Sequence, residues 1–590
     1  MTDTLLLDLT LPRTLDLWVS EFAQARWRGA RVHGWLFEGV AARRAAEQRL
    51  QEAGVTATLR SAYKPLLHYF LEEVDCAGLA EVTITYPVHP AAAPRRFLLE
   101  AYPLAALLPG CRLEFEPGNA DLNYQLAFRL KDGRQLQASV FAPNRRHVDH
   151  LDATSLSPTG WLRTQTAAGP VEQTDAAQKT DYEQVFEKIV HTVSQQPWPV
   201  REPYFERLDI RVDLPGTERI LPVGHECIST HEALHEDIYF SLLEVFQRRS
   251  GRASSDRRLQ PGQIVPDVRA SLAAPRLRIA LSRFDATAQD RRAGACPAHE
   301  EPLEQLGIAP HPDRIAGEMH RLGGQCFGAL SRQGRTVHGL YHAAPGAAVL
   351  ISGGQHANET SGVVGALRAA WHLKAGGNAH FALIALENPD GYALHRELSL
   401  QHPRHMHHAA RYSALGDDIE YREQPPIYER QARQEALAVS GARLHINLHG
   451  YPAHEWTRPL SGYLPRSFEL WTIPKGFFLI LRHHPGWAAR GRALLERVSA
   501  ALGQVDGLAG YNARQMALYE RHAGQLPFEV LNGMACLQSE SIHTGAPLTL
   551  ITEFPDETVH GEAFRFAHTV QMSATVAAVQ AWQDIADCAA

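Results

Sequence analysis

The sequence lacks the features of several broad classes of protein. None of its 590 residues belongs to a run that approaches the ~18 consecutive apolar residues of a membrane-spanning helix, so we expect no membrane partner. The formal net charge of -7 leaves no basic excess for a nucleic-acid surface, so we expect no nucleic-acid partner. The first residues, MTDTLLLDLTLPRTLDLW, lack the basic and then continuously apolar stretches of a signal peptide, and we expect none.

Cysteine is also scarce. The seven cysteines are scattered, odd in number and without a C-x-x-C pair. A set of this kind indicates reduced thiols rather than a disulfide framework. We therefore expect a cytoplasmic protein.

Histidine, in contrast, is abundant, and the chain is long. The 31 histidines offer many neutral imidazoles for binding a metal ion. A chain of 590 residues exceeds what one compact core usually holds, so we expect several domains. Two turn-rich stretches, 152–180 and 284–314, have the composition of linkers or long loops. They divide the chain into blocks at 1–151, 181–283 and 316–590.

The third block alternates apolar strands with helices. Four apolar runs of strand length, AAVLISGG, HFALIALEN, RLHINLHG and PLTLITEF, are separated or followed by helical patterns such as ETSGVVGALRAAWHLKAG. This alternation is typical of an α/β sandwich around a largely parallel sheet. The first two blocks mix helical and strand patterns and are predicted as smaller α+β units.

An H-E-x-x-H pattern, which binds zinc in many proteases, occurs at residues 231–235. Its two histidines would share one face of a helix. Ser229 and Glu232, however, form a capping box that predicts a helix start, and no third ligand follows at the expected spacing. We interpret the motif as a capped helix whose His231 and His235 pack in the core or at an interface, and a metal there is the less favoured hypothesis.

A second set of polar residues lies at strand ends of the third block. His356 and Glu359 follow the first strand, His449 ends the third, and Glu553 ends the last. In open α/β sheets the ligand site lies beyond the carboxyl ends of the strands, so these four side chains should meet at one rim. Two imidazoles and a carboxylate leave a fourth tetrahedral position for water, and a further carboxylate is the general base that such a site needs.

Together these motifs resemble the zinc carboxypeptidase superfamily. The resemblance is confined to the third block and rests on the glycine-preceded H-x-x-E, N-P-D-G-Y at 388–392, the strand-terminal L-H-G and the late T-E-F. It implies an α/β/α sandwich with a mixed sheet of about eight strands. It also implies that His356, Glu359 and His449 bind one zinc ion, and that Glu553 is the general base.

The resemblance implies two further roles in catalysis. The family has an arginine that polarises the scissile carbonyl, and Arg404 fits its spacing best, with Arg396 and Arg411 as rivals. Asp418, in the stretch GDDIEY, would be the carboxylate that orients a zinc-binding histidine. The alternative for Asp418 is a turn residue.

The chain departs from the family where a substrate's terminal carboxylate would bind. The family has Asn-Arg where this chain has Glu420-Tyr421. Tyrosine cannot form the ion pair with a carboxylate, and Glu420 would repel an anion. Arg422 is one residue further on and would point the other way. Recognition of a chain end is therefore in doubt, and the predicted substrate contacts are Glu420, Tyr421, Tyr451 and Asn388.

Two further segments leave alternatives open. The stretch PRHMHHAARY favours a solvated loop over a second metal site, and its histidines are His402, His405, His407 and His408. The aromatic-rich residues 451–480 would either wall a substrate cleft or pack against the N-terminal blocks.

We therefore predict a cytoplasmic zinc metallohydrolase that cleaves a peptide or peptide-like amide. The N-terminal blocks would shape the cleft or mediate self-association. GGQHANETSG also resembles the start of aspartoacylases and succinylglutamate desuccinylases, so a deacylase of N-acyl amino acids is an alternative. A zinc-bound protein without catalytic activity is the alternative from another class, and the presence of Glu553 argues against it.

Overall fold

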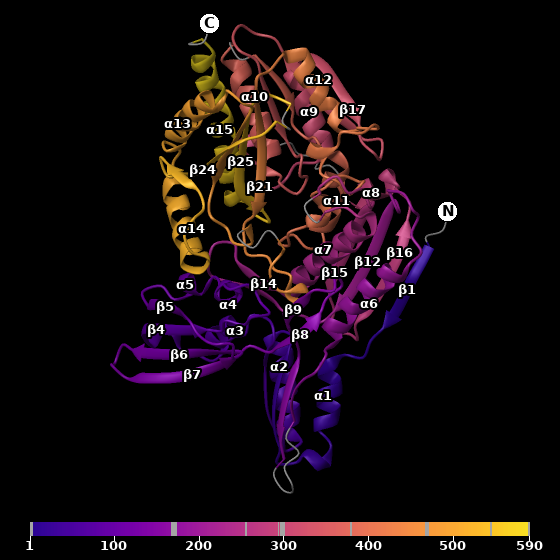
Figure 1. The fold of residues 1–590 in the computed structure, drawn as a ribbon, viewed down its shortest axis with the longest axis vertical. Coiled ribbons are helices and arrows are strands. Elements are labelled where there is room, and N and C mark those ends of the chain that lie inside the picture. Colours follow the sequence, from indigo (N-terminus) through magenta and orange to yellow (C-terminus); the bar gives the residue numbers. More distant parts are fainter. Residues whose placement is uncertain are drawn as a thin grey trace.

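The computed structural model has a mixed α/β architecture (Figure 1). It describes residues 4–166, 174–253, 256–292, 294, 301–377, 380–466, 471–542 and 545–587. The largest sheet and its helices form one end of the molecule, and the N-terminal elements form the other (Figure 1). No helix among these residues combines the length and the apolar character needed to cross a membrane.

The largest sheet contains nine of the described strands and lies in the third block. Four of its eight neighbouring pairs are parallel and four are antiparallel, so the sheet is mixed, as predicted. The prediction that it has about eight, largely parallel strands was wrong. The predicted apolar runs form the parallel centre, whereas short or polar edge strands escaped notice. The order is β17 (Gln325–Leu330), β18 (Thr336–His342), β20 (Phe381–Ile384), β19 (Val349–Gly353), β21 (Leu444–Pro452), β25 (Leu548–Glu557), β22 (Phe478–His483), β24 (Met534–Glu540), β23 (Glu529–Leu531).

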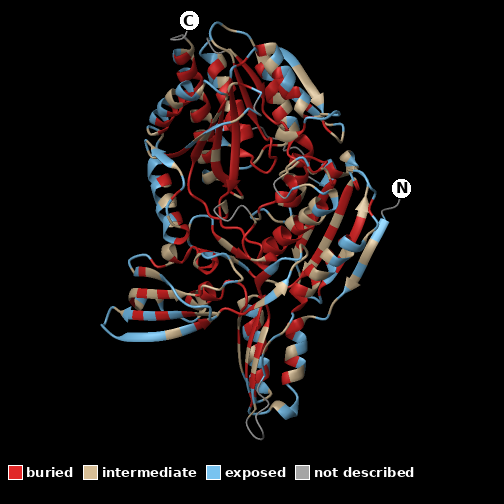
Figure 2. Ribbon diagram, viewed as in Figure 1, coloured by how far each residue is buried: buried red, intermediate tan, exposed pale blue. Residues whose placement is uncertain are grey.

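Helices cover both faces of this sheet. On β19, Val349 and Ile351 join a core with α10 (Ser361–Ala375), α13 (Ala488–Leu502) and α15 (Glu562–Asp587). The intervening Leu350 joins a smaller core with α12 (Arg430–Ser440). Successive strand residues point to opposite faces, so a continuous apolar run can serve both layers. Figure 2 shows the central strands as buried.

The described residues of the N-terminal half form three four-stranded sheets. They are ordered β1 (Thr4–Thr10), β16 (Arg276–Ser282), β12 (Arg207–Leu214), β15 (Gln263–Ala270); β11 (Thr174–Ala177), β10 (Trp161–Gln165), β2 (Arg31–Leu36), β3 (Thr56–Ser61); and β5 (Arg112–Pro117), β4 (Leu79–Tyr86), β6 (Asn123–Leu130), β7 (Gln135–Phe141). The hairpin predicted at Asp132-Gly133 is confirmed by the β6–β7 pair. Most of β7 is exposed (Figure 2).

Part of the predicted linker at 152–180 is strand instead. It holds β9 (Thr154–Pro158), which pairs with β8 (Asn144–Val148), and then β10 and β11. Pro158, the last residue of β9, and Gly160, between β9 and β10, gave the stretch its turn-like composition. Because β10 pairs with β2 and β1 pairs with β16, strands from distant parts of the chain share sheets. The three block boundaries themselves stay a prediction.

Helix α7 (Thr230–Ser250) connects the two halves of the molecule. Ser229 caps its start by accepting a hydrogen bond from the Glu232 amide at 2.9 Å, as predicted, and Gly251 ends it with a left-handed φ of 71°. One hydrophobic core contains Leu242 of α7 and Tyr451 of β21. The N-terminal half therefore packs against the carboxyl-end rim of the large sheet.

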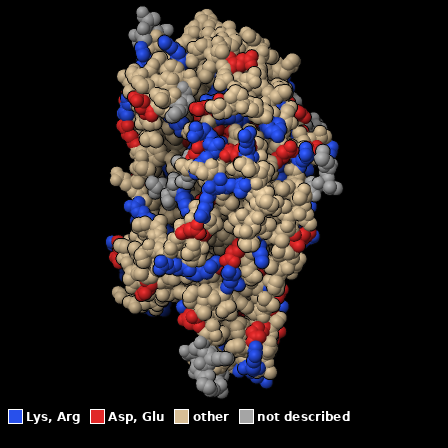
Figure 3. All heavy atoms as spheres, turned by 45° about the vertical axis from the view of Figure 1, so that its right-hand side comes forward, with Lys and Arg blue, Asp and Glu red and all other residues tan. Residues whose placement is uncertain are grey.

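The described residues also form further α-helices and one more small sheet. They are α1 (Thr14–Phe22), α2 (Val40–Glu52), α3 (Pro65–Glu72), α4 (Arg96–Glu100), α5 (Leu104–Leu107), α6 (Asp181–Gln195), α8 (Ala286–Arg292), α9 (Pro312–Leu322), α11 (Pro389–Ser399) and α14 (Leu508–Ala523), with a two-stranded sheet of β13 (Glu218–Ile220) and β14 (Cys227–Ser229). On the face in Figure 3, basic and acidic side chains are interspersed.

Candidate active site

The four side chains predicted to meet at one rim do so. His449 on β21 lies directly beside Glu553 on the parallel strand β25. His356 and Glu359 lie in the turn between β19 and α10. Gly354 takes a φ of +63° in this turn, a conformation that side-chain-bearing residues rarely adopt, and so lets the chain leave the strand sharply.

Three of these residues bring their ligand atoms together. His356 Nδ1 lies 3.0 Å from His449 Nδ1 and 2.9 Å from Glu359 Oε1, and His449 Nδ1 lies 2.8 Å from Glu359 Oε2. All three residues are buried. Their donor atoms form one of the two groups in the described residues with metal-binding proximity. Two imidazole nitrogens and a carboxylate suit a zinc ion, so these residues fit that metal.

Asp418 holds the opposite side of the first imidazole. Its Oδ2 lies 3.4 Å from His356 Nε2, and Gln355 donates a hydrogen bond to its Oδ1 at 2.9 Å. Burial raises the pKa of Asp418, but His356 and Arg257 outweigh burial and hold the pKa well below its usual range. A carboxylate at Nε2 directs Nδ1 toward the other two ligand atoms, which is the arrangement predicted for Asp418.

Glu553 faces the ligand group across a cavity. The cavity has a volume of about 210 Å³, and its lining includes His356, His449 and Glu553. Burial raises the pKa of Glu553 well above its ordinary value, and repulsion from the Glu359 carboxylate adds to this effect. A carboxylate with a raised pKa is suited to accept and return a proton near neutral pH.

Of the three arginines proposed to polarise the carbonyl, Arg411 rather than Arg404 lines the cavity. Arg411 forms an ion pair with Glu359, lies 3.9 Å from Glu557, and lines the cavity. Arg404 is exposed and is not among the cavity-lining residues. Arg396 also lies outside the lining. The sequence spacing favoured Arg404 because the irregular segment after α11 gives no indication of which arginine turns inward.

The predicted substrate contacts divide into two groups. Glu420, Tyr421 and Tyr451 line the cavity. Asn388 does not, because it caps α11 through a 2.9 Å hydrogen bond from the Gly391 amide and binds backbone carbonyls with its Nδ2. Glu420 forms an ion pair with the buried Arg433, which offsets the negative charge expected to repel an anion.

Sequence reasoning missed Arg257, which comes from the loop after α7. It lines the cavity, its guanidinium lies 5.9 Å from the centre of the Tyr421 ring, and its Nη1 lies 3.7 Å from Asp418 Oδ2. Arg422, by contrast, is buried in ion pairs with Asp417 and Glu429, in agreement with the prediction that it points away. No local sequence signal marks Arg257, because it reaches the cavity only through packing of the two halves.

The histidines of the H-E-x-x-H motif do not share a metal-binding group in the described structure. His231 contacts Glu218 at 2.8 Å and the Leu214 carbonyl at 3.0 Å. His235 is buried with its ring 5.8 Å from that of His407, and burial lowers its pKa to about 3. The favoured prediction of core histidines is therefore confirmed. The carboxylate of Glu232 turns away from the predicted capping box and contacts His454.

The segment PRHMHHAARY is not a solvated loop, contrary to the prediction. His407 and His408 are buried, and His408 contacts Glu236 of α7 at 2.5 Å. His402 and His405 stack on each other with ring centres 4.9 Å apart. The aromatic segment takes both predicted roles, because Trp456 and Trp471 line the cavity while residues such as Tyr463 pack into the core shared with the N-terminal half.

The comparisons with known proteins found similar structures but no similar sequences. No family model and no curated protein match the chain. Its structure is similar to a candidate metallopeptidase of Shewanella denitrificans OS217, with 18% identity over 47% of this chain and 88% of the other and a TM-score of 0.28. A metallo-carboxypeptidase from Burkholderia cenocepacia is 15% identical over 54% of this chain and 76% of its own, with a TM-score of 0.27.

Bovine thrombin-activatable fibrinolysis inhibitor, solved with tick carboxypeptidase inhibitor, is 10% identical over 48% of this chain and 99% of its own, with a TM-score of 0.29. A metallo-carboxypeptidase is thus among the structural neighbours. Because each TM-score is below 0.5, we base the functional proposal on the site itself.

Proposed function

We propose that this chain is a zinc-dependent hydrolase of peptide or peptide-like amide bonds. One observation carries the proposal: the Nδ1 atoms of His356 and His449 and the carboxylate of Glu359 converge within 3.0 Å of one another, beside a cavity that also contains Glu553. Arg411 pairs with one of the two buried carboxylates, and a divalent ion would offset the remaining cost of burying both beside two imidazoles.

His356, Glu359 and His449 would hold the metal. Bound zinc supplies a Lewis acid and lowers the pKa of a water molecule at its open position. Glu553 takes the proton of the attacking water and returns it to the leaving nitrogen, a role that its raised pKa supports. Asp418 keeps His356 oriented through Nε2.

Arg411 is the residue that we assign to the developing oxyanion. Its guanidinium lies in the cavity wall beside Glu359 and remains positively charged at any physiological pH. A fixed cation aimed at the carbonyl oxygen stabilises the charge that forms during attack. This assignment replaces Arg404, which is exposed outside the cavity.

Arg257 is our candidate for contact with a substrate carboxylate. It brings a cation next to Tyr421, the position where the family carries an arginine. The chain thus retains a positive group at this end of the cavity, although the group comes from a distant segment. We propose that the substrate carries a carboxylate near the scissile bond.

The test combines metal analysis with activity. Glu553→Gln should keep one equivalent of zinc at the site and lose at least about 100-fold in kcat, because a glutamine cannot shuttle the proton. Glu540→Gln, at an exposed glutamate on strand β24 of the same sheet, is the matched control and should keep both. Glu553→Gln that retains wild-type activity would overturn the assignment.

Two substrate sets separate this proposal from its alternatives. Peptides with a blocked N-terminus and small N-acyl amino acids are assayed side by side with the wild-type protein. Faster cleavage of the peptides supports a peptidase, and faster cleavage of the N-acyl amino acids supports the deacylase. Full zinc occupancy at His449 with no turnover of either set would favour a binding protein.

A further inference from the structure

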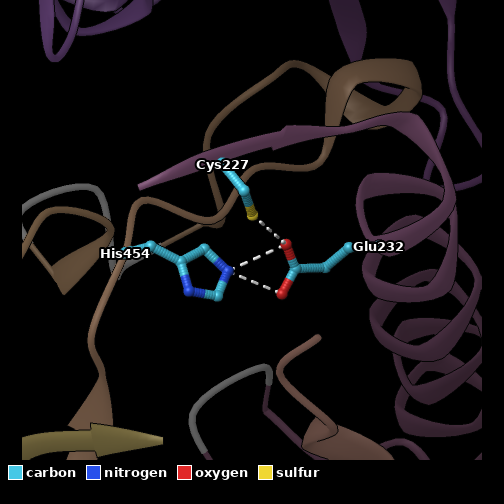
Figure 4. A group of neighbouring side chains, drawn as sticks. All are labelled: Cys227, Glu232 and His454. Atoms are coloured by element: carbon cyan, nitrogen blue, oxygen red, sulfur yellow. Dashed lines mark hydrogen bonds and ion pairs between the residues drawn. The ribbon is translucent and has the colours of Figure 1, made fainter. Parts of the chain in front are cut away.

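A second cluster with metal-ligand chemistry lies between the two halves of the molecule, apart from the candidate active site. It consists of Cys227 at the start of β14, Glu232 in the first turn of α7, and His454 just after β21 (Figure 4). His454 Nε2 lies 2.8 Å from Glu232 Oε1 and 2.9 Å from Glu232 Oε2. The Cys227 thiol lies 3.9 Å from Glu232 Oε2. The three side chains point to one common space (Figure 4).

Partners outside the cluster orient two of these side chains. The Met406 amide donates to Glu232 Oε1 at 2.6 Å, which leaves Oε2 facing the thiol. Thr558 Oγ1 lies 3.1 Å from His454 Nδ1, so Nε2 is the nitrogen that faces inward. Thr558 has a φ of 76°, which is unfavourable for a β-branched residue. Hydrogen bonds to the far side of a ligand are what metal sites use to fix ligand direction.

The spacing of the ligand atoms is close to that of a zinc site. Bonds of about 2.3 Å to sulfur and about 2.0 Å to nitrogen or oxygen place tetrahedral S and O atoms roughly 3.5 Å apart, and N and O atoms roughly 3.3 Å apart. The corresponding distances here are 3.9 Å and 2.9 Å. Shifts of about half an ångström, available from side-chain rotation, would close the site. Thiolate with imidazole favours zinc over magnesium or calcium.

We propose that Cys227, Glu232 and His454 bind a second zinc ion that links the two halves of the molecule, leaving the fourth position to water. Such an ion would join α7 and β14 to the segment that directly follows His449. It would therefore hold the N-terminal half against the rim that carries the candidate active site. Glu232 and His454 are buried and Cys227 is partly buried, so the cluster is largely shielded from solvent.

Cobalt substitution gives an optical signal for the second site. The candidate active site has no sulfur ligand, so thiolate-to-cobalt charge-transfer absorption in the near ultraviolet reports the second site alone. We expect this band in wild-type protein reconstituted with Co²⁺, its loss in Cys227→Ser, and its retention in Cys111→Ser, another partly buried free cysteine. Absence of the band in the fully loaded wild type would overturn the proposal.

Metal stoichiometry separates the two sites. We expect two zinc ions per wild-type chain, one in Cys227→Ser or His454→Ala, and one in His449→Ala. A single ion that is lost in His449→Ala and kept in Cys227→Ser overturns the second site and leaves the proposed function standing. A single ion with the reverse behaviour supports the second site and overturns the catalytic one.

Discussion

Substitution of the buried Lys475 tests how the aromatic residues beside the cavity are packed. Its side chain is buried, and its Nζ has no hydrogen-bond partner within the described structure. The Nζ lies 4.5–5.7 Å from the ring centres of four aromatic residues, Trp471, Tyr451, Phe478 and Tyr519. Burial lowers the pKa of Lys475 from 10.5 to about 7, although attraction to the Glu553 carboxylate opposes the shift.

This low pKa makes the free energy of unfolding depend on pH. Between pH 7 and 10.5 the folded state leaves Lys475 neutral while the unfolded state protonates it, so the folded state binds fewer protons. The free energy of unfolding therefore rises with pH across this window, by at most about 1.4 kcal/mol per pH unit. Below pH 7 the buried Lys475 lowers the free energy of unfolding by its largest amount, which is at most about 5 kcal/mol.

Lys475→Met should remove this dependence, because methionine fills the same elongated space without an amine. We expect the variant to be more stable than wild type at pH 7.5, with an advantage that shrinks by up to about 3 kcal/mol at pH 9.5. Urea unfolding followed by tryptophan fluorescence at the two pH values gives the difference. Lys374→Met is the control. The Lys374 Nζ also lies near an aromatic ring, that of Trp371, but it donates a hydrogen bond to the Leu322 carbonyl. A Lys475→Met protein whose stability difference from wild type is the same at both pH values would refute this reasoning.

Three further substitutions test single side chains of the site. Asp418→Asn should weaken zinc binding by about 10–100-fold, measured by competition with a chelator, because the histidine it orients loses its partner. Arg257→Met should raise KM for a carboxylate-bearing substrate by roughly 10-fold or more with kcat nearly unchanged. The control Arg258→Met should leave KM unchanged. Equal KM values in the two variants would exclude a contact between Arg257 and the substrate carboxylate. Arg411→Met should lower kcat by about 10²–10³-fold at full zinc occupancy, and Arg404→Met should not; the reverse result would restore the original assignment.

The rim of the large sheet could be predicted because local sequence and topology agree there. An apolar run long enough to be buried on both faces is visible in the sequence, and the polar residue that ends it is visible too. Parallel central strands then bring those ends together without further information. This logic located His356, Glu359, His449 and Glu553, and the register of β21 with β25 places the last two side by side.

The rest could not be predicted because it depends on contacts between distant segments. Arg257 and His454 reach their places through packing of α7 against the third block, and neither lies in a periodic pattern. Arg411 and Arg404 lie in the same irregular segment, and only the path of that segment places Arg411 in the cavity and Arg404 outside it. The edge strands β17 and β23 were missed for a different reason, since they bury one face at most and so carry too few apolar residues.

The contribution of α7 also changes how the N-terminal half should be understood. Phe240 of α7 lines the cavity and stacks on Trp456, with ring centres 5.4 Å apart and an angle of 19° between the planes. Arg257 supplies a cation to the same cavity. A third block alone would have neither this wall nor this charge, and Trp456 would face water. The N-terminal half is therefore part of the cavity rather than a module attached beside it, and residues of both halves of the chain line that cavity.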